Sequence, residues 1–336
     1  DGRHVTDMSY KVNGVGFVPG RAEARSWRPA QLWRQTVGDT AKQQLTTVLY
    51  SHRSPEVSPD GKWIAFVADA RLRSDSVVDL ERDALATLPY NKVRDEAERN
   101  DSDIYLVSSA GGAPRKVAEW MGAESDLTWS PDGKQLAFIA LEKLHVMDYP
   151  GGTPRRVSTL NMIESEPAWS PDGKSLAWVT WSNDGGRLYK AAVSPRAVAP
   201  VLLSKTVGTL RQPVWAPNGA RIVLTQTAAQ GRRDQTGVTA PTNIVWYPAT
   251  PTAVGGSEPM VIARAAGRSV PHFSKDTSRI YLSSSANGLV SIRWDGSDEQ
   301  RHLRVTGPAA GGSVDDHDVN PSELMLQRDT EEPNTP

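Results

Sequence analysis

Apolar residues recur along this chain in five similar units, each following a short polar turn. In the first two units the apolar runs are Ile64-Ala65-Phe66 and Leu136-Ala137-Phe138. Because consecutive positions are apolar, both faces of these segments are expected to be buried, as in a strand covered on both sides by neighbouring sheets. The equivalent runs of the later units are Leu176-Ala177-Trp178, Ile222-Val223-Leu224 and Ile280-Tyr281-Leu282.

Each unit carries three further strand-like segments. A first strand precedes the polar turn and ends in Val57, Trp129, Trp169, Trp215 or Phe273. A fourth, such as Pro154–Val157, follows a turn that is Gly-Gly in three units. Four strands per unit, recurring every 40 to 72 residues, predict an all-β fold, a β-propeller of four-stranded blades. The third strands are expected at Asp103–Val107, Lys143–Met147, Arg187–Ala191, Asn243–Tyr247 and Leu289–Arg293.

The polar turn is a repeated phrase, clearest as Ser130-Pro131-Asp132-Gly133-Lys134. Proline presets φ, the aspartate caps the turn with its side chain, and glycine takes a positive φ. Asp60, Asp132 and Asp172 are therefore predicted to form turns rather than to act as catalytic acids. The other copies begin at Ser58, Ser170, Ala216 and Ser274, and the last two are degenerate.

The remaining segments define the domain organisation. Residues 1–30 are predicted to be an irregular arm, residues 31–328 the propeller, and residues 329–336 a frayed tail. We expect six blades, the last closed by both termini: strands at Gln31–Gln35 and Gln43–Thr46 would join Asp318–Arg328, which removes open sheet edges. Two insertions interrupt the repeats. Residues 71–101 carry a helical stripe, and residues 226–242 are expected to form a flexible hairpin tip.

Composition excludes several classes of function. The chain has 336 residues with 38 basic and 39 acidic side chains, so its net charge of −1 offers no field for nucleic acid. No stretch approaches the roughly 20 apolar residues that cross a bilayer. Cysteine is absent, which excludes disulfides and thiolate metal sites. A periplasmic or otherwise exported location is favoured slightly over a cytoplasmic one.

Motifs of known chemistry are missing from the sequence. There is no nucleophile elbow, Walker loop, His-Glu-x-x-His or EF-hand pattern, and the six histidines never fall at metal-ligand spacing. His145 shares a column with Tyr105 and Tyr189, so it is predicted to be a strand residue. Asp315-Asp316-His317-Asp318 is interpreted as an exposed acidic loop, with a cation site as the alternative. We therefore expect no catalytic residue, metal or cofactor in this chain.

The candidate binding site follows from position in the repeat. In a propeller the first strands line a central tunnel, and the segments entering them meet at one mouth. A charged peptide end or a partner's loop would suit such a surface; the alternative is that these charges pair with one another in solvent. The predicted mouth residues lie four to six positions before the first residue of each phrase, except for one that lies two positions before it. They are His52, Arg53, Glu124, Asp126, Glu164, Glu166, Arg211, Gln212, Arg268 and, two positions before its phrase, His272.

Trp-Ser-Pro-Asp-Gly-Lys and Gly-Gly-Thr-Pro-Arg-Arg-Val resemble the repeats of the TolB-like propeller family over roughly residues 31–305. Residues 10–46 and the first repeat look like the propeller of acylaminoacyl and prolyl-oligopeptidase relatives. Val179-Thr180-Trp181-Ser182 and the segment 279–296 look more like the propeller that precedes an amidohydrolase domain. In both families the chemistry belongs to another domain.

The resemblance implies a non-catalytic module that binds or gates a peptide or small substrate, or packs on a covalently linked bacterial hydrolase domain. The alternative is a stand-alone periplasmic scaffold that binds a partner protein at the tunnel mouth. A third possibility is a hydrolase with its site in the tunnel. Fold analogy alone does not choose among the three.

Overall fold

The computed structural model describes residues 9–10, 16–17, 31–35, 40–47, 52–69, 87, 102–118, 123–228, 241–274, 277–284, 288–305 and 326–327. The chain forms two compact units, residues 1–124 and residues 125–336. Within the described residues every regular element is a strand, and every strand pair is antiparallel. The predicted all-β class is therefore confirmed.

The first unit contains two small sheets and one four-stranded sheet. Its strands are β1 (Ser9–Tyr10) paired with β2 (Gly16–Phe17), β3 (Trp33–Gln35) paired with β4 (Lys42–Gln44), and then blade A, made of β5 (Arg53–Val57), β6 (Trp63–Asp69), β7 (Ser102–Ser108) and β8 (Arg115–Ala118).

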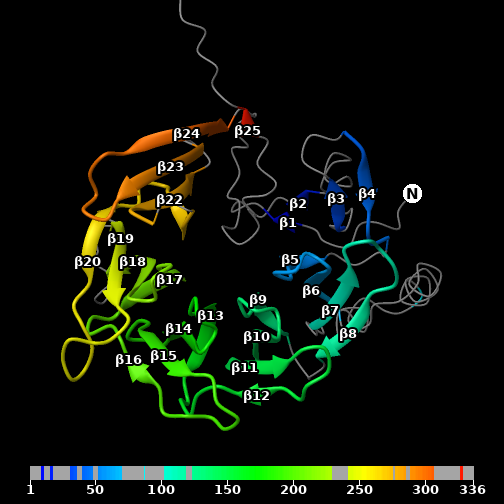
Figure 1. Ribbon diagram of the computed structural model, residues 1–336, viewed down its shortest axis with the longest axis horizontal. Helices are drawn as coiled ribbons and strands as arrows, with labels where there is room; N and C mark the ends of the chain where they lie inside the picture. Colours follow the sequence, from blue (N-terminus) through cyan, green and yellow to red (C-terminus); the bar gives the residue numbers. More distant parts are fainter. Residues whose placement is uncertain are drawn as a thin grey trace, which may run out of the picture. The chain divides into compact units, whose positions relative to one another are not determined.

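The second unit contains four blades, each with its strands in chain order across the sheet (Figure 1). Blade B is β9 (Ser125–Trp129), β10 (Gln135–Ala140), β11 (Lys143–Asp148) and β12 (Arg155–Arg156). Blade C is β13 (Ile163–Trp169), β14 (Ser175–Trp181), β15 (Leu188–Ala192) and β16 (Val201–Leu202). Blade D is β17 (Gly208–Trp215), β18 (Arg221–Ala228), β19 (Thr242–Pro248) and β20 (Met260–Arg264). Blade E is β21 (Ser269–His272), β22 (Arg279–Ser284), β23 (Gly288–Arg293) and β24 (Gln300–Val305), with β25 (Leu326–Gln327) added at its edge.

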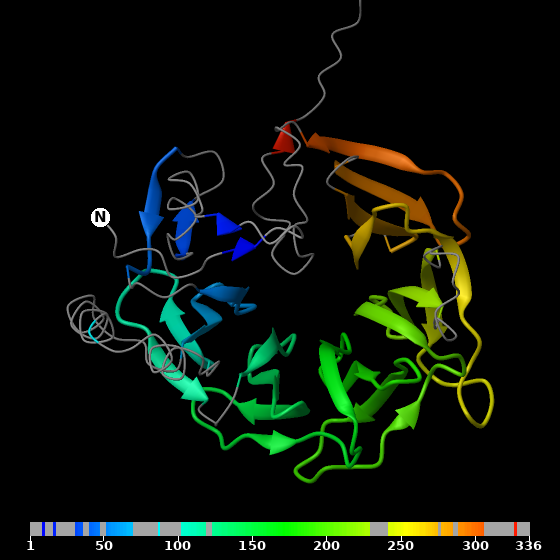
Figure 2. The same cartoon turned by 180° about the vertical axis from the view of Figure 1, so that it is seen from behind.

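Both views show the blades of the second unit side by side, and Figure 1 labels β9, β13 and β17 as the innermost strands of blades B, C and D (Figures 1 and 2). The second strands are buried on both faces: Leu176, Ala177 and Trp178 of β14 are fully buried, and so are their counterparts in β10. This confirms the apolar pattern of the sequence. The observed third strands agree with the predicted ones to within a residue at either end.

The repeated phrase forms the same hydrogen-bonded turn in its three intact copies. In the second copy the Ser130 hydroxyl donates to Asp132 Oδ1 over 2.7 Å and accepts the N–H of Gln135. The N–H of Lys134 donates to the same carboxylate oxygen, and Gly133 has a φ of 69°. The Ser130 hydroxyl, followed by that backbone N–H, lowers the pKa of Asp132. These aspartates hold turns, as predicted.

Tryptophans at the ends of the first strands join consecutive blades. The indole of Trp169 donates to the Thr128 carbonyl of blade B over 3.3 Å, and Trp215 donates to the Ala168 carbonyl of blade C over 3.0 Å. Trp169 also belongs to one buried apolar cluster with Leu144 and Val146 of blade B. Blade A carries the exposed Val57 at this position.

The predicted segment boundaries are only partly within the described residues. Residues 71–101, including the expected helix, lie outside them except for Thr87. The second insertion is shorter than residues 226–242, because β18 continues to Ala228 and β19 begins at Thr242. Leu326 and Gln327, from the segment expected to complete a terminal blade, pair with β24. The sheets are consistent with six blades, and the remaining residues of that closure are not described.

Replacing Trp169 with Ala should lower the free energy of unfolding by about 3–5 kcal/mol, because a buried indole is lost from the seam between blades B and C. Trp169→Phe keeps most of the packing and loses only the hydrogen bond to Thr128, so its loss should be clearly smaller. Urea unfolding followed by circular dichroism measures both. Equal losses in the two variants would contradict a role for the indole volume.

Candidate functional site

The predicted mouth residues of the second unit lie at the entry ends of the first strands, where their backbone has an unusual conformation. Asp126, Glu166, Gln212 and Val270 occupy the same position of consecutive blades and have φ values of 50° to 56°. Glu166, Gln212 and Val270 each coincide with an irregularity in the pairing of the first and second strands. A left-handed residue at a β-bulge turns its N–H away from its own sheet.

These turned N–H groups are bound by side chains of the preceding blade. The N–H of Glu166 donates to Asp126 Oδ2 over 2.8 Å, and the N–H of Gln212 donates to Glu166 Oε2. The N–H of Val270 donates to Gln212 Oε1 over 2.8 Å. We call this series the seam relay. It connects blades B to E, and it brings together three of the predicted mouth residues as structural acceptors.

Glu164, another predicted mouth residue, is also committed to a seam. Its side chain is only 1% exposed. One carboxylate oxygen accepts the N–H of Leu144 over 2.7 Å, and the other accepts the Ser158 hydroxyl. The Arg156 guanidinium lies 4.0 Å from Glu164 Oε2, the oxygen that accepts the N–H of Leu144. A buried carboxylate satisfied by two donors and a cation stabilises the contact of blades B and C and offers little to a ligand.

The other predicted mouth residues lie in different surroundings. In the second unit, Arg268 pairs with Glu299 and donates to the Ala265 carbonyl, while His272 Nδ1 donates to the Val270 carbonyl. In the first unit, His52 and Glu124 are buried and Arg53 is exposed. His52 stacks on Phe66 with 4.6 Å between ring centroids, and the N–H of Glu124 donates to the Ser102 carbonyl.

An exposed apolar group next to the relay was missed from the sequence. Leu141 is 60% exposed and Ile163 is 42% exposed. They are neighbours because the N–H of Glu164 donates to the carbonyl of Glu142, the second residue of the β10–β11 turn. Leu141 and Glu142 have φ values of 50° and 60°. Holding a leucine in the left-handed backbone region costs conformational energy. Because Leu141 bears this cost and is also exposed, we take it as a candidate for a binding role.

Trp181 and Arg211 extend this group. Trp181 lies opposite Ile163 in the pairing of β14 with β13, and its indole donates to Ser165 Oγ over 3.1 Å. The Arg211 guanidinium of blade D lies 6.0 Å from the centroid of the indole ring, a cation–π distance. We call Leu141, Ile163, Trp181 and Arg211 the entry rim. Aligning the phrase could not reveal it, because three of the four residues lie outside the column of predicted mouth residues.

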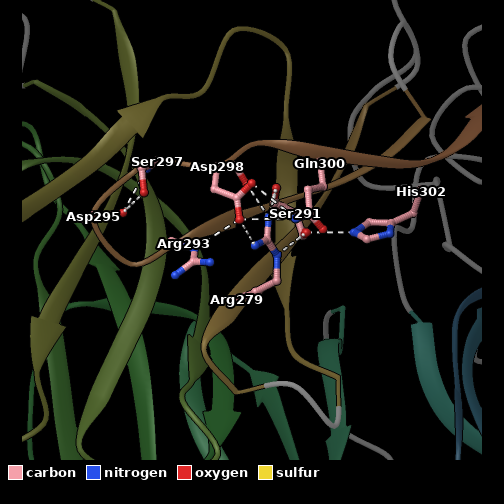
Figure 3. Close-up of polar contacts among 8 residues, drawn as sticks. All are labelled: Arg279, Ser291, Arg293, Asp295, Ser297, Asp298, Gln300 and His302. Atoms are coloured by element: carbon pink, nitrogen blue, oxygen red, sulfur yellow. Dashed lines mark hydrogen bonds and ion pairs between the residues drawn. The ribbon is translucent and has the colours of Figure 1, made fainter.

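Blade E carries a polar network that includes a serine and a histidine (Figure 3). Ser291 Oγ lies 2.7 Å from His302 Nε2 and accepts Arg279 Nε over 2.7 Å. Arg279 also donates to Asp298 Oδ2 over 2.7 Å. A serine beside a histidine can be an activated nucleophile, but Ser291 is fully buried and its oxygen already accepts the guanidinium. The network holds the β23–β24 loop.

The described part of the chain offers few other candidates for a metal, catalytic or membrane-spanning role. No group of three or more His, Asp or Glu side chains there could hold a metal ion. His145 lies in β11, as predicted, and burial lowers its pKa. No helix among the described residues is long and apolar enough to cross a membrane.

Comparison with known proteins supports the propeller assignment. A family model described as the TolB beta propeller domain matches residues 95–239. The fold is similar to an oligogalacturonate lyase solved in complex with manganese (TM-score 0.52, 14% identity, 77% of this chain and 69% of that chain). It is also similar to oligogalacturonate lyase from Vibrio parahaemolyticus (TM-score 0.52, 11% identity, 76% and 69%).

TolB from Acinetobacter baumannii aligns with a TM-score of 0.48 and 16% identity over 77% of this chain. The chain spans 56% of that protein's length. No curated protein sequence matches the chain. The predicted resemblance to TolB-like propellers is confirmed by the family match and the fold.

Replacing Glu166 with Ala should lower the free energy of unfolding by about 1–3 kcal/mol, because the half-buried N–H of Gln212 loses its acceptor. Glu166→Gln keeps an amide oxygen at the same place and should retain most of the stability. Chemical denaturation of the two variants beside the parent measures the difference. If glutamine and alanine are equally destabilising, the acceptor is not what matters.

Asp298 should make the chain sensitive to acid. The Arg279 guanidinium, helped by Arg293 and Gln300, lowers the pKa of Asp298 from 3.8 to about 2. Since the folded-state pKa lies below the unfolded one, this stabilisation is complete above about pH 4 and is lost between about pH 4 and pH 2. Asp298→Asn should flatten the loss of thermal stability over that range. An unchanged slope in Asp298→Asn contradicts the assignment.

Proposed function

We propose that this chain, whose repeats are similar to those of TolB-like β-propellers, is a non-catalytic binding module whose entry rim takes a peptide or partner-protein segment. The observation that carries this proposal is that several polar residues at the entry ends are bound within the seams between blades, whereas exposed apolar residues lie beside them. Asp126, Glu166 and Gln212 are engaged in the seam relay. The relay fixes the frame, and beside it the exposed Leu141 and Ile163 and the half-buried Trp181 and Arg211 are available for contact.

The chemistry of the entry rim favours a segment with an apolar side chain next to an acidic one. Trp181 offers a large, oriented ring of the kind that carries binding energy at protein interfaces. Leu141 and Ile163 add exposed apolar area, and Arg211 supplies a cation beside the ring. Glu142, exposed in the same turn, limits the number of acidic groups that a partner can bring.

Within this proposal, the module serves a bacterial hydrolase of the amidohydrolase or serine-peptidase type, by binding or gating its substrate or by packing on its catalytic domain. A stand-alone periplasmic scaffold that binds a partner protein is the alternative. The gene sequence beyond residue 336 separates the two: a hydrolase motif in the same reading frame supports the first, and a stop codon supports the second.

Selection of peptides from a displayed random library by the full chain tests the binding role. Trp181→Ala should weaken the selected peptides at least about tenfold, because the aromatic anchor is lost. Arg211→Ala should weaken them less and reduce the preference for acidic residues. Lys134→Ala, at an exposed phrase turn, should bind as the parent does. Peptide binding that Trp181→Ala leaves unchanged would remove the entry rim as the site, and failure to select any peptide would count against the binding role itself.

A further inference from the structure

Lys190 lies at the seam between blades C and D, at a third-strand position that is apolar in three of the other blades and Ser291 in blade E. It lies directly opposite Ala177 in the pairing of β15 with β14. Three other blades place an apolar residue opposite the equivalent second-strand position. These residues are Leu106 in blade A, Val146 in blade B and Trp246 in blade D.

The surroundings of Lys190 are apolar on both sides. Directly opposite residues of antiparallel strands share a face, so Lys190 lies between Ala177 and Val201 of the neighbouring strands. Ala177 is fully buried in a cluster that includes Trp215 and Tyr247 of blade D. The Lys190 side chain is half-buried, so its stem follows the apolar seam while its end can be reached from solvent.

Lys190 also lacks the acidic partner that several other lysines of the chain have. Lys134 lies 3.7 Å from Asp132, and Lys205 lies 2.9 Å from Glu258. Among the described residues, no carboxylate lies within ion-pair distance of Lys190 and no hydrogen bond holds its ammonium group. Burial without a compensating charge disfavours the ammonium form and lowers the pKa of Lys190.

We propose that Lys190 is an acylation site, where an amine set in an apolar seam without an acidic partner reacts with activated acyl donors ahead of the chain's exposed lysines. The neutral amine nitrogen attacks the acyl carbon and forms the C–N bond. The leaving group departs with the electron pair of the bond that breaks, and the nitrogen loses its extra proton to water. The product is a neutral amide, which suits the apolar column better than an ammonium group does.

The test is competitive labelling of the full folded chain with a limiting amount of the N-hydroxysuccinimide ester of acetic acid at pH 7.5. Peptide mass spectrometry then gives the rate for each lysine. Lys190 should react at least about threefold faster than Lys134 and Lys205, because more of it is the free amine. In 8 M urea, about the strength that removes the fold, the three rates should converge.

Two variants locate the cause. Val201→Glu places a carboxylate across the strand pair from Lys190, which should bring its rate down to within about twofold of Lys205. Met260→Glu, at another exposed outer-strand position, should leave the rate of Lys190 unchanged. Lys190 reacting no faster than Lys134 and Lys205 in the folded chain overturns the proposal. A fast rate that survives Val201→Glu overturns the missing acid as its cause.

Discussion

The structure of the second unit depends on one constraint: in blades C, D and E a left-handed residue of the first strand turns its N–H across the seam, and the preceding blade must supply an acceptor. Holding Glu166 in this conformation, with a φ of 51°, costs energy for a residue with a side chain. The hydrogen bond to Asp126 offsets that cost. Because the acceptor comes from the same repeat position of the preceding blade, the relay also sets the register of neighbouring blades.

This constraint separates scaffold from binding surface. A carboxylate that accepts a backbone N–H in a half-buried seam is held in position, so it stabilises the frame but is poorly available to a ligand. Glu164 shows the extreme case, with both oxygens bound in the interior. The surface left for recognition is therefore the part of the entry rim whose side chains do not serve the relay, namely Trp181, Ile163 and Leu141.

The sequence predicts what the repeat imposes. Column alignment of the phrase identified the buried second strands, the turn role of Asp132 and the position of the entry ends, because each of these recurs in several blades. It could not tell whether Glu164 faces solvent or the seam, because that depends on the bulge at Glu166 and not on any local pattern. Trp181 and Leu141 were missed for the opposite reason. They share a column, eleven residues after the phrase serine, but that column is polar in the other three copies and so gives no repeated signal. Only the pairing of β13 with β14 brings Ile163 and Trp181 together.

Departures from the repeat are consequently where chemistry is to be sought in such a chain. A residue kept in the column of every blade satisfies a requirement of packing or hydrogen bonding that every seam shares. A residue that differs from most of its column does not serve that shared requirement. Lys190 carries a cost of desolvation, and Leu141 carries a cost of backbone strain. A buried charge is not by itself such a signal, because the charge of Arg279 is compensated by Ser291 and Asp298 within the same blade. Uncompensated departures, rather than all departures, point to function.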